Sequence, residues 1–251
     1  MKYLSLKQIE KYHKDGFLHV KKVFTKKECS NLKKIIQYEI SKGKKIYKKF
    51  KGKNKKETTY NKNKLADVPR KIDTGFLQDI AHRNPKIMQL AKNIKMIKLV
   101  SRIFGKNVAA YRLYRSLSIF KTKDILSKTP WHQDMPYWKG DSNKLSIWVS
   151  LDKVTKKSGS VCYIPGSHKH ICQHVKTDSY LVAKNVDESK RVSIETEIGD
   201  VLIHHSMIVH GSEENIMGKS RYALIFTYQP ATDESHHRSG FAELIEQRIG
   251  N

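Results

Sequence analysis

The sequence predicts an α+β fold: a double-stranded β-helix (jelly roll, cupin-like) barrel core with N-terminal helices packed on it. Apolar residues recur at helical spacing in the first part of the chain, whereas short apolar runs alternate with turns from residue 108 onward. Strands that follow a helical lead-in are typical of a sheet core backed by helices. We expect one domain over 1–251, with a helical lead-in at 1–107, the jelly-roll core at 108–230 and a C-terminal tail at 231–251.

Three helices are expected before the core. The first should occupy 5–16 and the second 25–43, because Ser5 and Thr25 each open a capping box, with Gln or Glu three residues later. The third should run over 84–105, since it starts with an asparagine cap and a first-turn proline. Their apolar stripes predict packing against the core.

The core should consist of short strands. Each run is apolar and bounded by turn residues, which is typical of a jelly roll. The stretch 169–191 is polar and is expected to be an insertion loop. The predicted strands lie at 108–121, 144–151, 160–164, 192–197, 201–209 and 221–229.

The charge of the chain is strongly positive, at +25, and it is unevenly distributed. The segment Lys42–Lys64 holds eleven lysines against one acid, Glu57. One interpretation is a solvated, mobile loop in a lysine-rich chain. The other is a surface that steers an anionic substrate or a nucleic acid toward the protein.

Cysteine usage and hydropathy favour a cytoplasmic protein. The three cysteines are odd in number and form no Cys-x-x-Cys pair, as expected in a reducing compartment. No apolar run approaches the length of a membrane span, and the first residues lack the apolar stretch of a secretory signal.

The segment around His132-x-Asp134 carries the strongest chemical signal. On an extended strand, side chains two residues apart point to the same face, so both can reach one ion. A third ligand from elsewhere in the chain would complete a two-histidine, one-carboxylate site for non-haem Fe(II).

His210 is the best candidate for that third ligand. It follows an apolar strand, and Arg221 opens another strand eleven residues later, so we expect the two on adjacent strands of a hairpin. An arginine beside an iron site suits a carboxylate co-substrate, which its guanidinium can hold by two hydrogen bonds. His204, His205 and His168 compete with His210 as donors.

These residues resemble the phytanoyl-CoA dioxygenase family of Fe(II)- and 2-oxoglutarate-dependent oxygenases. Beyond the metal motif, the similarity includes the segments 12–18, 147–152, 158–160 and 164–168, in the order of the family. The resemblance implies that Fe(II), 2-oxoglutarate and O₂ take part in the reaction. It implies these roles: His132, Asp134 and His210 bind iron, and Arg221, Lys121 and Trp148 contact 2-oxoglutarate.

The resemblance also implies the reaction, which is hydroxylation of an unactivated C–H bond with release of succinate and CO₂. Family halogenases have a small residue in place of Asp134, so its presence favours hydroxylation. The substrate should be a small molecule, and the positive charge of the chain favours an anionic one; its candidate contacts are Tyr137, Trp138 and Arg70, with Arg112 and Tyr60 as further candidates. Two alternatives stay open: an oxygenase that modifies nucleic acid, and a catalytically silent jelly-roll binding protein.

Overall fold

The structure is a computed structural model. It describes residues 4–50, 72–105, 108, 110–125, 128–138, 140–177, 180–235 and the backbone of 243–246. The helices among these residues are α1 (Leu6–Asp15), α2 (Lys26–Phe50), α5 (Ile80–Arg83), α6 (Pro85–Ala91) and α7 (Ile94–Phe104), with short 3-10 turns at Ile72–Thr74, Met135–Tyr137, Lys156–Ser158, Ser167–Lys169 and Glu188–Lys190. None of the helices in the described part of the chain has the length and apolar character needed to cross a membrane.

Two antiparallel sheets form the core, which confirms the predicted jelly-roll class. The large sheet has the order β1 (Phe17–Val20), β10 (Val201–His205), β5 (Leu145–Ser150), β12 (Arg221–Pro230), β3 (Ala110–Lys121) and β13 (Glu243–Glu246), with β2 (Phe76–Gln78) also paired to β3. The small sheet has the order β4 (Thr129–His132), β11 (His210–Ser212), β6 (Val161–Tyr163) and β9 (Val192–Ile194). A separate hairpin joins β7 (His174–Lys176) to β8 (Leu181–Ala183).

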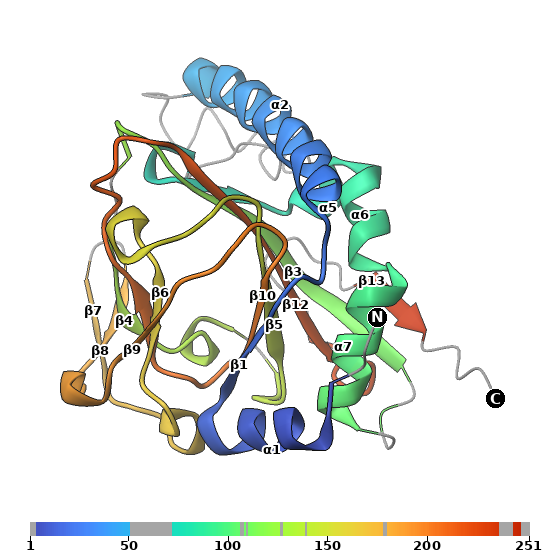
Figure 1. Cartoon of the computed structure of the whole chain (residues 1–251), viewed down its shortest axis with the longest axis vertical. Helices are drawn as coiled ribbons and strands as arrows, with labels where there is room; N and C mark the ends of the chain where they lie inside the picture. Colours follow the sequence, from blue (N-terminus) through green and yellow to red (C-terminus); the bar gives the residue numbers. More distant parts are fainter. Residues whose placement is uncertain are drawn as a thin grey trace.

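The two faces of the large sheet have different partners. Ile147 and Val149 of β5 belong to the main core cluster, which they share with residues of α2, α6 and α7. Trp148, between them, belongs to a second cluster that includes Val161 and Tyr163 of the small sheet. Side chains alternate along a strand, so one face packs on the helices and the other faces the small sheet. Figure 1 shows α2, α6 and α7 on one side of the large sheet and the small sheet on the other.

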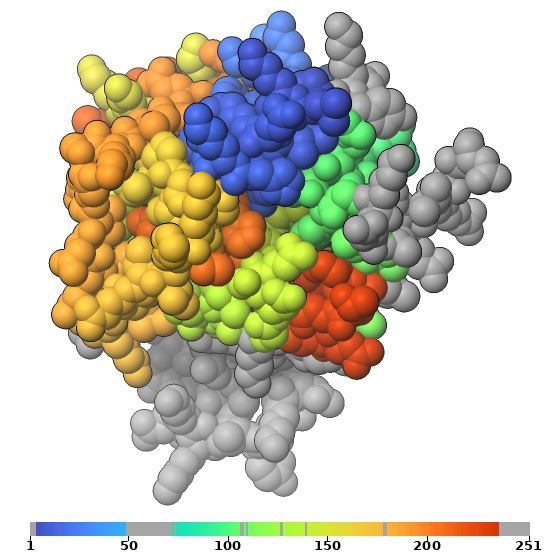
Figure 2. All heavy atoms as spheres, turned by 90° about the horizontal axis from the view of Figure 1, so that it is seen from below, coloured from blue at the N-terminus to red at the C-terminus, as the bar shows by residue number. Residues whose placement is uncertain are grey.

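The first helix ends as predicted. Gly16 adopts φ +83°, and its amide donates to the carbonyl of Tyr12 at 2.7 Å. A side chain here would also collide with His168, since a Cβ would lie 2.4 Å from its Nδ1. The chain then enters β1, and Asp15 accepts a hydrogen bond from the Gly166 amide at 2.9 Å. In Figure 2 the blue N-terminal segment lies directly against the yellow part of the chain.

Two helix predictions were wrong at their boundaries. The second helix does not end near Gly43 but continues to Phe50, because Gly43 is buried and Tyr47, one turn later, packs against the core. The third predicted helix is two helices. Asn93 caps a new one by accepting from the Lys95 amide at 2.8 Å, which separates α6 from α7.

Three segments of the second half differ from the expectation. The predicted strand 201–209 ends at His205, and the chain turns before β11 begins in the other sheet. The expected insertion loop 169–191 contains the β7–β8 hairpin, and the expected tail contributes β13.

Of the basic segment, 42–50 is helical rather than loop, and 51–64 lies outside the described residues.

Candidate metal centre and co-substrate pocket

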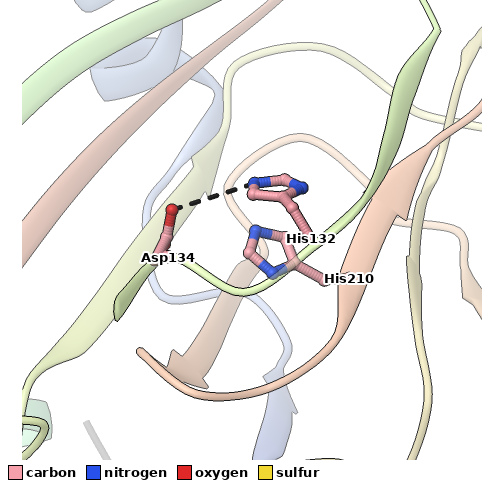
Figure 3. A group of neighbouring side chains, drawn as sticks. All are labelled: His132, Asp134 and His210. Carbon is pink, nitrogen blue, oxygen red and sulfur yellow. Dashed lines mark ion pairs between the residues drawn. The ribbon is translucent and has the colours of Figure 1, made fainter. Parts of the chain in front are cut away.

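The structure brings His132, Asp134 and His210 together between the sheets. One ligand atom of each lies within 4.8 Å of the others. The rings of His132 and His210 are 4.2 Å apart at their centroids, and His132 Nε2 lies 3.8 Å from Asp134 Oδ1. Figure 3 shows the carboxylate facing the two imidazoles. Two imidazoles and one carboxylate at this spacing can hold a divalent metal ion.

The backbone that positions these side chains is not the single extended strand that we predicted. His132 ends β4 and lies opposite His210 of β11. Asp134 has helical angles, φ −73° and ψ −35°, and starts a 3-10 turn. The amides of Asp134 and Met135 donate to the carbonyl of Ser206 at 3.0 and 3.1 Å, which holds this turn beside the loop before His210. The carboxylate therefore reaches the site from a turn, not from a shared strand face.

The two histidines are fixed in the tautomer that a metal requires. His132 Nδ1 donates to the carbonyl of Pro130 at 2.9 Å, and His210 Nδ1 donates to the carbonyl of Ile208 at 3.0 Å. In each ring the lone pair is then on Nε2. Burial lowers the pKa of both histidines to about 4, so both are neutral at physiological pH.

Asp134 stays ionised in the same site. Burial alone would raise its pKa, but His204 and the other neighbouring imidazoles hold the pKa below its usual value. Among the described residues, the basic side chains within 4 Å of its carboxylate are the imidazoles of His132 and His204, each 3.8 Å away, and no lysine or arginine. A buried carboxylate needs a compensating cation, which a bound metal ion would supply.

The competing histidines occupy other places. His204 lines the cavity beside the metal cluster, and its Nδ1 accepts from the hydroxyl of Tyr163 at 3.1 Å. His205 and His168 contact each other outside it, with ring centroids 5.5 Å apart. His204 and His210 belong to different sheets, and their ring centroids lie 4.8 Å apart because the two sheets face each other.

Arg221 lies at another end of the cavity, on the large sheet. Our prediction that it forms a hairpin with His210 was wrong, because β11 and β12 belong to different sheets. The side chain is 2% exposed and donates to the carbonyl of Gly159, and its guanidinium carbon lies 5.3 Å from the Trp148 ring centroid. Its Nε finds no hydrogen-bond partner among the described residues.

Lys121 lies directly opposite Arg221 in the β3–β12 pairing. Its ammonium donates to the hydroxyl of Ser212 at 3.0 Å and to the carbonyl of Glu213. Burial, and then the charge of Arg221, lower its pKa to about 7. Burial also lowers the pKa of Arg221 to about 10, so the arginine remains charged at neutral pH. Two adjacent buried cations favour an anionic ligand.

Gly159 makes room for this pair of cations. It has φ +84°, and a Cβ there would lie 2.9 Å from Lys121 Nζ and 2.6 Å from the carbonyl oxygen of Glu213. Only glycine accepts that backbone angle without strain and also permits this close approach. The predicted segment 158–160 therefore shapes the cation end of the cavity.

A cavity of about 130 Å³ connects the metal cluster with Arg221. Tyr137 and Trp138 both line it, whereas Arg70 falls outside the described residues. Arg112 does not line it and donates to the carbonyl of Ala231 at 3.2 Å. The remaining lining includes Phe76, Gln78, Arg115, Leu117, Ile119, Thr129, Ser146, Val161, Tyr180, Gly211, Ser212, Ile225 and Thr227.

Sequence reasoning missed Arg115, Ser146 and Thr227. The alternation of β3 could have placed Arg115 on the same face as Lys121, six residues later. Ser146 and Thr227 carry no such signal, because they become neighbours only through the pairing of β5 with β12.

Comparisons with known proteins agree with this geometry. The family model of the phytanoyl-CoA dioxygenases matches residues 12–223. A probable phytanoyl-CoA dioxygenase of Caenorhabditis elegans is 24% identical over 239 residues, covering 90% of this chain and 75% of that protein.

Solved structures share the fold. The non-haem α-ketoglutarate-dependent carbocyclase SnoK from nogalamycin biosynthesis superposes with a TM-score of 0.70 at 19% identity, covering 93% of this chain and 87% of that one. EctD from S. alaskensis, solved with 2-oxoglutarate and 5-hydroxyectoine, gives a TM-score of 0.67 at 18% identity, with coverage of 95% and 80%. With the family model matching most of its length, the chain belongs to the phytanoyl-CoA dioxygenase family.

Proposed function

We propose that this protein is an Fe(II)- and 2-oxoglutarate-dependent dioxygenase that hydroxylates a C–H bond of a small organic substrate. One observation carries the proposal: two neutral imidazoles and an ionised carboxylate converge at one end of a cavity that holds a buried, charged arginine at another. The family membership supports the same reaction class. A silent binding protein would not need this ligand set.

In the proposed site, His132, Asp134 and His210 hold the iron through Nε2, a carboxylate oxygen and Nε2. When bound, iron and 2-oxoglutarate supply the oxidising chemistry, in which O₂ is consumed and succinate and CO₂ are released. The protein binds and orients. Arg221, which lines the cavity, receives the distal carboxylate of 2-oxoglutarate, Lys121, which does not line it, adds its charge from the paired strand, and Trp148 packs against the guanidinium face.

The substrate side of the proposal rests on the aromatic wall that follows Asp134. The Tyr137 hydroxyl donates to the carbonyl of Leu181 at 3.2 Å, so it ties the β7–β8 hairpin to the metal-binding turn. Trp138 is 8% exposed and packs on Tyr114, with ring centroids 5.4 Å apart. These rings exclude water from the reacting position and limit the substrate to a small molecule.

Anaerobic titration tests the proposal directly. Adding Fe(II) and then 2-oxoglutarate to the purified protein should produce the weak visible charge-transfer band of that chelate. His132→Ala and His210→Ala should each abolish the band, because two protein ligands cannot hold the facial geometry. His205→Ala is the matched control, since His205 lies outside the cavity lining. A band that survives both ligand substitutions would disprove the assignment.

The cellular compartment and the nucleic-acid alternative are both argued from the sequence alone. The cytoplasmic setting rests on cysteine usage, and Cys29, Cys162 and Cys172 are free thiols. The nucleic-acid alternative rests only on the lysine content, and much of the lysine segment lies outside the described residues.

A further inference from the structure

The inner face of the large sheet carries a row of polar residues beside the metal cluster. Arg115 of β3 lies opposite Thr227 of β12, Thr227 lies opposite Ser146 of β5, and Ser146 lies opposite His204 of β10. All four residues line the cavity. We call Arg115, Thr227, Ser146 and His204 the polar row.

The next row along the same strands is apolar, which makes the polar row distinctive. Leu117 lies opposite Ile225, Ile225 opposite Trp148, and Trp148 opposite Leu202. A sheet face that packs against another sheet usually carries such residues, because buried polar groups cost free energy unless they are hydrogen-bonded. A polar row in this position therefore indicates a polar ligand.

The hydroxyls of the polar row have hydrogen-bonding capacity left. Ser146 and Thr227 are each 1% exposed, and their oxygens are 2.9 Å apart. One hydroxyl donates to the other, so the second can still donate its proton to a ligand. Trp138 adds to this, because its buried indole N–H has no acceptor among the described residues and the side chain lines the same cavity. A bound anion would accept from these donors.

Arg115 is placed apart from the cations assigned to 2-oxoglutarate. It lies six residues from Lys121 along β3, which corresponds to roughly 20 Å between the backbone positions, and Leu117 and Ile119 intervene on the same face. Arg115 lies on the side of the metal cluster instead, because the strand pairing links it through Thr227 and Ser146 to His204, whose Nε2 lies 3.8 Å from Asp134 Oδ2. Asp134, the one carboxylate that lines the cavity among the described residues, belongs to the metal cluster, and outside the lining Arg115 also acts on Asp79, whose pKa its charge lowers against the effect of burial.

We infer that the polar row binds an oxyanion group of the primary substrate, a carboxylate or a phosphate, next to the metal. Arg115 supplies the charge and a fork of donors, and the Ser146–Thr227 pair supplies a hydroxyl donor. The substrate is thus a small acid whose apolar part lies against the aromatic wall, with a C–H bond a few atoms from the anion facing the metal. This inference rests on the proposed function, since it assigns the substrate of the same site.

Titration of the anaerobic Fe(II)–2-oxoglutarate complex with matched ligands tests the inference. The probes are butanoate, pentanoate and hexanoate, their amides, and the corresponding alkyl phosphates, with perturbation of the charge-transfer band as the readout. One class of acid should bind more tightly than its uncharged analogue, and the preferred class identifies the oxyanion. Arg115→Gln should weaken that acid by about 10- to 100-fold, as expected for a lost charge-assisted contact, and leave the amide unchanged.

Two further variants make the result specific. Thr227→Val preserves the shape but removes a hydroxyl, so it should weaken the acid by about 3- to 10-fold. Arg112→Gln is the matched control on the same strand, because its side chain bonds to the backbone of Ala231 outside the cavity lining, and it should behave as wild type. Thermal melting of each variant separates lost binding from lost folding.

Two outcomes would overturn the inference. If wild type shows no preference for any acid over its amide, the polar row does not bind an oxyanion. If Arg115→Gln weakens 2-oxoglutarate as strongly as the acids, Arg115 belongs to the co-substrate site. In both cases the charge-transfer band itself still forms, so the proposed function stands; only failure of wild type to form the band would disprove that.

Discussion

The metal end and the cation end of the cavity are stabilised in different ways. At the metal end, His132 and His210 are neutral and each ring is held by a backbone carbonyl two residues earlier in the chain. At the cation end, Arg221 and Lys121 lie side by side on paired strands, buried and without an acidic side chain within ion-pair distance among the described residues. At the metal end the ligand side chains already have the orientation and protonation that a metal ion requires. At the cation end two like charges are buried next to each other and repel.

This difference indicates how the two ligands should bind. Near neutral pH none of the metal ligands has to lose a proton before it binds the ion, so metal binding should depend mainly on the geometry of the turn and of β11. The two cations repel each other and are desolvated, as their lowered pKa values indicate. A dicarboxylate that neutralises them relieves this cost, so charge should dominate 2-oxoglutarate binding.

The largest effect should come from removing the charge at the cation end. Arg221→Ala should weaken 2-oxoglutarate by roughly a hundredfold, because a charge-assisted contact by a forked guanidinium is lost. Binding of Fe(II) alone should change little, since Arg221 is not in the metal cluster. Titration of the charge-transfer band with 2-oxoglutarate measures the first effect, and metal titration measures the second.

Arg221→Lys provides the matched control for this prediction. It keeps the positive charge but loses the fork, so an intermediate affinity is expected if both contribute. If Arg221→Ala binds 2-oxoglutarate as wild type does, the distal carboxylate is held by another cation, with Lys121 as the first candidate.

At the metal end, we expect the largest loss of stability from replacing Gln133, which lies between the two ligands of the motif. Its fully buried amide nitrogen donates to the carbonyls of His170 and Met207 at 2.8 and 2.5 Å, and its oxygen accepts from the Cys172 amide at 2.8 Å. Gln133→Ala leaves three backbone groups without these partners, so we expect the free energy of unfolding to fall by about 2–4 kcal/mol.

Denaturant unfolding measures this loss. The metal affinity of Gln133→Ala should fall as well, because the turn that carries Asp134 loses one of its attachments to the loop before His210, the bond to Met207, and keeps only those to Ser206. Gln78→Ala is a suitable control, since Gln78 also lines the cavity but lies on β2, away from the metal-binding turn. Equal stability of the Gln133 and Gln78 variants would show that this network does not hold the metal end.

The two ends also differ in how far the sequence could predict them. His132-x-Asp134 is a local pattern, and the jelly-roll class followed from the order of helices and strands. We predicted that His132 and Asp134 are close because they share one face of an extended strand. This reason was wrong, because Asp134 has helical backbone angles and reaches the site from a turn. Short turns depend on hydrogen bonds to distant backbone, here to Ser206, and these leave no trace in a single sequence.

The cation end depends on the pairing of strands that are far apart in sequence. Lys121 meets Arg221 only because β3 pairs with β12 in one register, and a slip of one residue would turn every side chain to the other face. The same holds for the polar row, which needs three correct registers. The strand order β10–β5–β12–β3 is a property of the whole fold, so alternation along β3 could indicate the face of Arg115, but Ser146 and Thr227 could not be recognised beforehand.

The smallest expected effect concerns the pH dependence of 2-oxoglutarate binding, and it separates the two ends most sharply. Lys121 has a pKa of about 7 in the free protein and faces Arg221 on β12 and the charges of Glu213 and Glu214, so its protonation changes near neutral pH. Its charged form binds the anion, and the anion in turn raises its pKa. Affinity should therefore be highest below pH 7 and fall by about tenfold per unit of pKa shift as the pH rises above 7, reaching a plateau above the pKa of the complex.

Burial brings the pKa values of His132 and His210 to about 4 and that of Arg221 to about 10, so these three groups keep their charge state between about pH 6 and pH 9, and variants of Lys121 assign the change in this window. Lys121→Met should bind weakly with no pH dependence over this range, whereas Lys121→Arg should bind tightly with none. Titration of the charge-transfer band at several pH values distinguishes these cases. If Lys121→Met keeps the slope of wild type, the titrating group lies elsewhere, and charge at the cation end comes from Arg221 alone.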